Sequence, residues 1–146
     1  MSSTLSPELS ALQTKIDAGT AHIGIYGLGY VGLPLALRFA EVGLKVTGFD
    51  IDSAKVQQLN AGESYIERLQ PAVIQRAQSH GFEATTDFSL SKEVDAIIIC
   101  DPTPLNRYRE PDLSYIIATI ESALPHMRAG QLVSLESTTW PGTTEE

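Results

Sequence analysis

Residues 23–34 read IGIYGLGYVGLP, an apolar run that is interrupted by Gly27, Gly29 and Gly32 before it becomes apolar again. The run before the first glycine has the pattern of a short buried strand, and the run after the last one has the pattern of a helix. Three side chains are therefore missing where a strand turns into a helix. Such a turn lets the backbone itself approach a ligand.

The spacing of the three glycines matches a dinucleotide-binding turn. The first glycine permits the tight turn, the second lets a pyrophosphate approach the backbone, and the third lets helix and strand pack closely. The next predicted strand, 45–50, ends in Asp50, where an acidic group accepts hydrogen bonds from an adenosine ribose. A carboxylate there also repels a 2′-phosphate, which favours NAD over NADP. The alternative is an ordinary tight turn with Asp50 as a solvated strand end.

The rest of the chain alternates strand and helix patterns. Helices are predicted at 31–43, at 52–62 with Asp52 or Ser53 as N-cap, at 70–80 before Gly81, and at 112–127 with Asp112 as cap. Strands are predicted at 21–26, 45–50, 82–87, 94–100 and 130–137. Apolar strands without clean alternation, separated by helices, indicate a parallel sheet covered on both faces. The predicted fold is a doubly wound α/β sheet of the Rossmann type.

Composition limits the possible partners. The chain has 146 residues, of which 42% are hydrophobic and 19% charged, so we expect one domain at 21–146 with a real core. Residues 1–20 are a polar lead-in with a helix, Pro7–Ala18, outside the sheet. The net charge of −8 argues against nucleic acid and anionic membranes as partners. Apolar runs are too short to span a membrane and no signal-peptide pattern is present, which predicts a cytoplasmic location.

The metal-binding and nucleophilic side chains show no site pattern. Cys100 is the only cysteine, which excludes an internal disulfide and a multi-cysteine metal site. It closes a buried apolar strand without a nearby histidine, so we expect a core thiol and not a nucleophile. His22, His80 and His126 lack ligand spacing and are interpreted as ordinary surface or strand-end residues.

Several separated motifs carry a specific resemblance: GLGYVGLPLA at 27–36, GFDID at 48–52, PTPLN at 102–106, REPDLS at 109–114 and ESTTWPGTTEE at 136–146. The chain from residue 21 onward resembles the NAD-binding half of the UDP-glucose/GDP-mannose dehydrogenase family, and within it the UDP-N-acetylglucosamine and UDP-N-acetylmannosamine 6-dehydrogenases. The resemblance implies oxidation of the carbon-6 alcohol of a UDP-sugar to a carboxylate, in two NAD-dependent steps through a thiohemiacetal and a thioester. It also implies a role in polysaccharide biosynthesis and a homodimer for the full-length protein.

The resemblance also implies roles for individual residues. Those expected to bind NAD are Gly27, Gly29, Tyr30, Val31, Gly32, Asp50, Lys55, Thr103 and Thr138. Thr138 is in addition expected to position a water or the reacting oxygen, which is the one catalytic role carried over. Tyr30 and Val31 are expected to shape the floor of the site by packing, and Lys55 to assist Asp50 at the ribose. The alternatives are a surface role for Lys55, and a cap or turn hydroxyl for Thr103 and Thr138.

One residue departs from the family pattern. Asp101 follows Cys100 where the family usually has an apolar residue, and a carboxylate near cofactor phosphates would weaken NAD binding unless it points away or caps a neighbouring N–H. The family's catalytic cysteine lies in a glycine-rich motif further downstream. We therefore expect residues 1–146 to be the cofactor domain, ending before the sixth strand of the sheet and inactive alone. The alternative is a stand-alone NAD-sensing or scaffold module.

Overall fold

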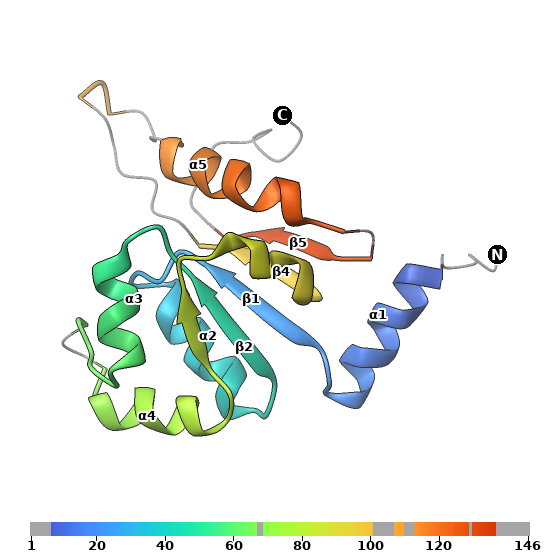
Figure 1. The fold of residues 1–146 in the computed structure, drawn as a ribbon, viewed down its shortest axis with the longest axis horizontal. Coiled ribbons are helices and arrows are strands. Elements are labelled where there is room, and N and C mark those ends of the chain that lie inside the picture. The colour runs from blue at the N-terminus through green and yellow to red at the C-terminus, as the bar shows by residue number, and fades with distance from the viewer. Residues whose placement is uncertain (1–6, 67–68, 101–106, 110–112, 129, 137–146) are drawn as a thin grey trace.

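The computed structural model describes residues 7–66, 69–100, 107–109, 113–128 and 130–136. Helices and strands alternate along the chain: α1 Pro7–Ala18, β1 His22–Tyr26, α2 Gly32–Glu41, β2 Lys45–Phe49, α3 Ser53–Asn60, α4 Pro71–Ser79, β3 Glu83–Thr85, η1 Phe88–Glu93, β4 Ala96–Ile99, α5 Ser114–Ala123, η2 Leu124–His126 and β5 Leu132–Leu135. The strands pair in parallel in the order β3-β2-β1-β4-β5 (Figure 1). The predicted doubly wound α/β fold is therefore confirmed.

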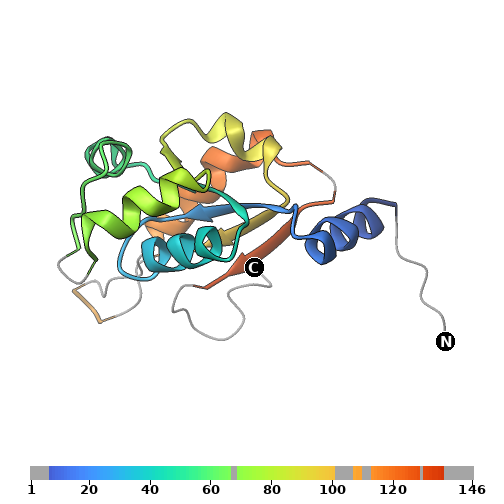
Figure 2. The same cartoon turned by 90° about the horizontal axis from the view of Figure 1, so that it is seen from below.

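The sheet has an apolar core on each face. Since successive strand residues point to opposite sides, Ile23 and Ile25 contribute to the core shared with α2, α3 and α4. Tyr26, Phe49 and Ile97 contribute to the second core, which η1 and α5 cover. Figure 2 shows α2 on one side of the strands and η1 on the other. This two-sided burial explains why the strands read as apolar runs without alternation.

The register of the central strands aligns the carboxyl ends of β1, β2 and β4. Tyr26 at the end of β1 pairs with Phe49 at the end of β2 and with Ile99 at the end of β4. The residues that follow these strands therefore leave the sheet at the same carboxyl edge. In open parallel sheets, ligands bind at this edge, where the strand order reverses around the first strand.

Most predicted element bounds lie within two residues of those observed. The exception is α5, which ends at Ala123 and continues as the 3-10 helix η2; Pro125 lacks the N–H that an α-helix needs there. The cap predicted for this helix, Asp112, lies outside the described residues. The pattern predicts no element where η1 forms. This 3-10 helix begins after Asp87, whose side chain accepts a hydrogen bond from the Ser89 N–H at 3.0 Å.

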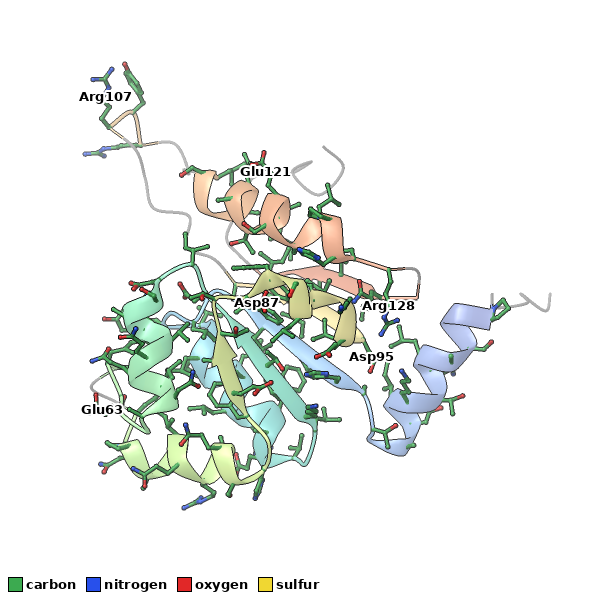
Figure 3. All side chains as sticks on the ribbon, viewed as in Figure 1. Glu63, Asp87, Asp95, Arg107, Glu121 and Arg128 are labelled. Atoms are coloured by element: carbon green, nitrogen blue, oxygen red, sulfur yellow. The ribbon has the colours of Figure 1, made fainter. Side chains whose placement is uncertain are left out.

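Helix α1 lies beyond the amino end of the sheet (Figures 1 and 2). Leu12 on this helix is buried, and Lys15 Nζ lies 2.9 Å from Oδ1 of the buried Asp95. The same carboxylate accepts hydrogen bonds from Arg128 Nη2 at 3.0 Å and from the backbone N–H of His22 at 2.8 Å. Figure 3 shows Asp95 and Arg128 next to each other on the side of the sheet that faces α1. One buried carboxylate thus joins α1, β1 and the segment before β5.

The α-helices in the described part of the chain have at most 12 residues. The longest of those described, α1, has 12 residues, and α2 and α5 have 10 each. None of the helices in the described ranges is long and apolar enough to cross a membrane.

Candidate dinucleotide-binding site

The glycine-rich turn connects β1 to α2, and its three glycines have different backbone conformations and surroundings. Gly27 has φ +95°, a conformation that other residues rarely adopt, and its N–H donates to the Phe49 carbonyl at 2.8 Å. A Cβ added to Gly32 would lie 1.7 Å from the Gly27 carbonyl oxygen, so only glycine allows α2 to start this close to the turn. A Cβ added to Gly29 would meet nothing within 4 Å. Gly29 therefore borders open space.

The first turn of α2 has unused hydrogen-bond donors. Its N-cap, Val31, makes no side-chain cap bond, and no acidic residue occupies the first turn. Within the described part of the chain, the N–H groups of Gly29, Tyr30, Val31 and Gly32 donate to no protein acceptor. Four N–H groups and the positive end of the helix dipole therefore lie beside the open space at Gly29. This arrangement is suited to binding phosphate oxygens without a basic side chain.

Asp50 follows β2 and is held against the glycine turn. Its side chain is buried; Oδ2 accepts a hydrogen bond from the Leu28 N–H at 2.9 Å and Oδ1 accepts one from the Asp52 N–H at 2.8 Å. These two bonds fix the carboxylate at the carboxyl edge of the sheet. Each oxygen keeps a second lone pair, so the group can still accept from ribose hydroxyls.

Tyr65, which the sequence analysis did not predict, connects Lys55 to the glycine turn. The Lys55 Nζ is 5.7 Å from the centroid of the Tyr65 ring, and the Tyr65 hydroxyl donates a hydrogen bond to the Leu28 carbonyl. Burial, followed by the nearby carboxylates of Asp50 and Asp52, raises the pKa of Tyr65, so the hydroxyl stays protonated. Nothing in the sequence marks Tyr65: it stands in the connection between α3 and α4, where no periodic pattern or motif applies.

That Tyr30 and Val31 shape the floor of the site by packing stays a prediction. Their side chains are 77% and 59% exposed. The interior positions around the turn are taken by Leu28 and Leu33, both fully buried, and the side chains of Tyr30 and Val31, which lie between them in the sequence, are directed outward. Tyr30 and Val31 can reach a cofactor through their backbone N–H groups or from the solvent side, but not as core residues.

Cys100 packs beneath the start of α2. It is buried, its N–H donates to the Tyr26 carbonyl at 2.6 Å, and a Cβ added to Gly32 would lie 3.2 Å from its Cβ. The expected buried position is confirmed. The candidate residues Thr103 and Thr138, and the unusual Asp101, lie outside the described residues.

Two of the histidines make structural contacts. The His22 ring bonds to the Thr47 hydroxyl at 2.7 Å and to the Glu93 carbonyl, and His80 Nδ1 lies 3.1 Å from the Ala40 carbonyl oxygen. Within the described ranges, no group of three or more histidine, cysteine or carboxylate side chains could hold a metal ion.

The geometry now defines a class of protein. A parallel sheet whose first strand ends in a glycine turn, next to an uncapped helix start and an acidic residue on the second strand, is a Rossmann-type dinucleotide-binding domain. The chain belongs to the UDP-glucose/GDP-mannose dehydrogenase family, since residues 21–146 match the model of that family's NAD-binding domain. NAD is thus the cofactor of this domain, and the open space at Gly29 and the free N–H groups fit it.

Similar proteins include several nucleotide-sugar dehydrogenases. The chain is 39% identical over 127 residues to the UDP-N-acetyl-D-mannosamine dehydrogenase of Salmonella typhi, covering 85% of this chain and 29% of that protein. It is 36% identical over 124 residues to the UDP-N-acetyl-D-glucosamine 6-dehydrogenase of the same organism, covering 85% and 28%. The solved NDP-N-acetyl-D-galactosaminuronic acid dehydrogenase of Methanosarcina mazei matches with a TM-score of 0.79 and 35% identity, covering 97% and 32%. The chain thus spans less than a third of these relatives' lengths.

Proposed function

We propose that this chain is the cofactor domain of an enzyme that oxidises the carbon-6 alcohol of a UDP-N-acetylhexosamine to a carboxylate in two NAD-dependent steps. The observation that carries the proposal is the open space at Gly29 beside four unused N–H groups, in a chain whose relatives are named as nucleotide-sugar dehydrogenases. A stand-alone NAD-binding module without catalysis is the alternative.

The described residues divide the work of holding NAD. The N–H groups from Gly29 to Gly32 would hold the pyrophosphate, and the preorganised Asp50 carboxylate would accept from the adenosine ribose. Lys55 would lie beside the same ribose. Bound NAD supplies the hydride acceptor, and two molecules are needed because converting an alcohol into a carboxylate removes four electrons. Thr138 near the nicotinamide and Thr103 along the cofactor remain proposals.

The names of the relatives point to the class of sugar. The relatives above are named for N-acetylmannosamine, N-acetylglucosamine and N-acetylgalactosaminuronic acid, all of which are N-acetylated amino sugars. These names support an N-acetylated amino sugar as the substrate class.

The test is an assay of the full-length protein that contains these residues. UDP-N-acetylglucosamine, UDP-N-acetylmannosamine, UDP-N-acetylgalactosamine and UDP-glucose would each be supplied with NAD while NADH absorbance is followed. We expect two NADH per sugar and the highest kcat/KM for one of the N-acetylated sugars. A preference for UDP-glucose would contradict the substrate class. NAD binding without NADH from any nucleotide sugar would favour the stand-alone module.

A further inference from the structure

Leu28, at the centre of the glycine turn, is held at both of its polar backbone groups. Its N–H donates to Asp50 Oδ2 at 2.9 Å, and its carbonyl accepts from the Tyr65 hydroxyl. Its side chain is fully buried and fills the space over Gly48. A Cβ added to Gly48 would lie 2.8 Å from the Leu28 Cδ2. The turn is thus anchored from two elements, β2 and the connection between α3 and α4.

The Tyr65 bond also sets the direction of the next N–H group. The Leu28–Gly29 peptide is trans and planar, so its carbonyl and the Gly29 N–H point in opposite directions. Because Tyr65 holds the carbonyl on one side, the Gly29 N–H is directed to the other side. This N–H donates to no acceptor among the described residues, and the space at Gly29 is open.

We propose that Tyr65 is a positioning residue of the dinucleotide site: its hydroxyl fixes the Leu28–Gly29 peptide so that the Gly29 N–H is presented to the pyrophosphate. The inference rests on the proposed cofactor site. Tyr65 acts through the Leu28 carbonyl and does not itself touch the cofactor. The high pKa of its hydroxyl, caused by burial and the nearby carboxylates, keeps the donor in place across the physiological pH range.

A purely structural role gives a different expectation. In that case Tyr65 only attaches the α3–α4 connection to the turn, and its loss would lower stability without changing the NAD affinity of the folded protein. The variant Tyr65→Phe separates the two, because it removes the hydroxyl and keeps the ring that lies near Lys55. The matched control is Tyr26→Phe, which removes a buried tyrosine hydroxyl bond to Ser91 Oγ at 2.7 Å; the Tyr26 ring lies in the second core, whereas Leu28 lies in the first.

The experiment combines calorimetric titration with NAD and 15N NMR of the Gly29 amide in the parent and both variants. We expect Tyr65→Phe to weaken NAD binding about 3- to 10-fold, the range for one net hydrogen bond. We also expect a smaller NAD-induced shift of the Gly29 amide at saturation. Tyr26→Phe should unfold at a lower temperature while its NAD affinity and Gly29 shift stay at the parent values.

Three results would overturn the inference. The first is parental NAD affinity and an unchanged Gly29 shift in Tyr65→Phe. The second is an equal loss in Tyr26→Phe, which would show that any lost tyrosine bond weakens binding through stability alone. The third is a parent whose Gly29 amide does not respond to NAD. This last result would also remove the proposed cofactor site, whereas the first two would leave that site standing.

Discussion

Gly29 and Gly32 lie in the same turn, yet their surroundings are opposite. A Cβ at Gly29 would enter open space, whereas a Cβ at Gly32 would meet the Gly27 carbonyl oxygen at 1.7 Å. Gly29 also lacks the positive φ that Gly27 has, so a side chain there creates no backbone strain. Gly29 thus leaves open space beside the turn, whereas Gly32 permits close packing.

Replacing Gly29 with valine should abolish detectable NAD binding and leave the fold intact. The added side chain would fill the space into which the pyrophosphate must come, while touching no protein atom. Calorimetric titration measures the binding, and thermal unfolding measures the fold. If Gly29→Val bound NAD like the parent, the phosphate site would have to lie elsewhere.

The contrasting variant is Gly32→Ala. Its methyl group has to displace backbone, so we expect a loss of unfolding free energy of about 1–3 kcal/mol, as in other overpacked sites. Urea unfolding measures this loss. A stability equal to that of Gly29→Val would contradict the assignment of the two glycines to different roles.

At the scale of elements, the patterns that predict correctly are local ones. The strands β1 and β4 are buried on both faces and appear as apolar runs, and the glycine turn and Asp50 form a motif within one strand-helix-strand unit. The 3-10 helix η1 has no such pattern, because it depends on the Asp87 cap and on burial of Phe88 in the second core.

Long-range contacts account for what the sequence did not predict. Tyr65 reaches a carbonyl 37 residues earlier in the chain, and Lys15 reaches Asp95 over 80 residues. Such partners are defined only once the sheet and its connections are in place. The outward direction of the Tyr30 side chain likewise depends on which neighbours fill the interior.

The attachment of α1 to the sheet through Lys15 and Asp95 gives a testable prediction. Asp95→Asn removes the charge that Lys15 and Arg128 share and should lower the unfolding free energy by about 2 kcal/mol at neutral pH. Urea denaturation checks the value, and proteolysis within α1 should become faster. A variant as stable as the parent would show that the ion pairs with Asp95 add nothing to the attachment of α1.

The same carboxylate predicts a pH dependence. Burial acts to raise the pKa of Asp95, but the His22 N–H, Lys15 and Arg128 outweigh it and lower the pKa below its ordinary value. The stabilisation is therefore fully present above the unfolded pKa of about 4 and is lost as the pH falls through the lower folded value. The stability difference between parent and Asp95→Asn should shrink below about pH 4. A difference that stays constant as the pH falls well below about 4 would contradict this assignment.

At the scale of the whole molecule, we expect residues 1–146 alone to form no NADH from NAD and any nucleotide sugar. Hydride transfer needs the sugar held against the nicotinamide, a positioning effect worth roughly 7–11 kcal/mol in favourable cases. The chain covers less than a third of its relatives, and Cys100 is buried beneath α2. NADH formation that is abolished by Cys100→Ala would show that the chemistry lies in this part.

The proposed NAD site at the glycine turn and Asp50 is tested by titrating residues 1–146 with NAD and with NADP in a calorimeter. The buried Asp50 carboxylate beside the turn should accept from the ribose diol and repel a 2′-phosphate. We expect measurable NAD binding, and we expect NADP to bind at least about tenfold more weakly, which is a difference of about 1.4 kcal/mol in binding free energy. Equal or tighter binding of NADP, or no binding of NAD, would contradict it.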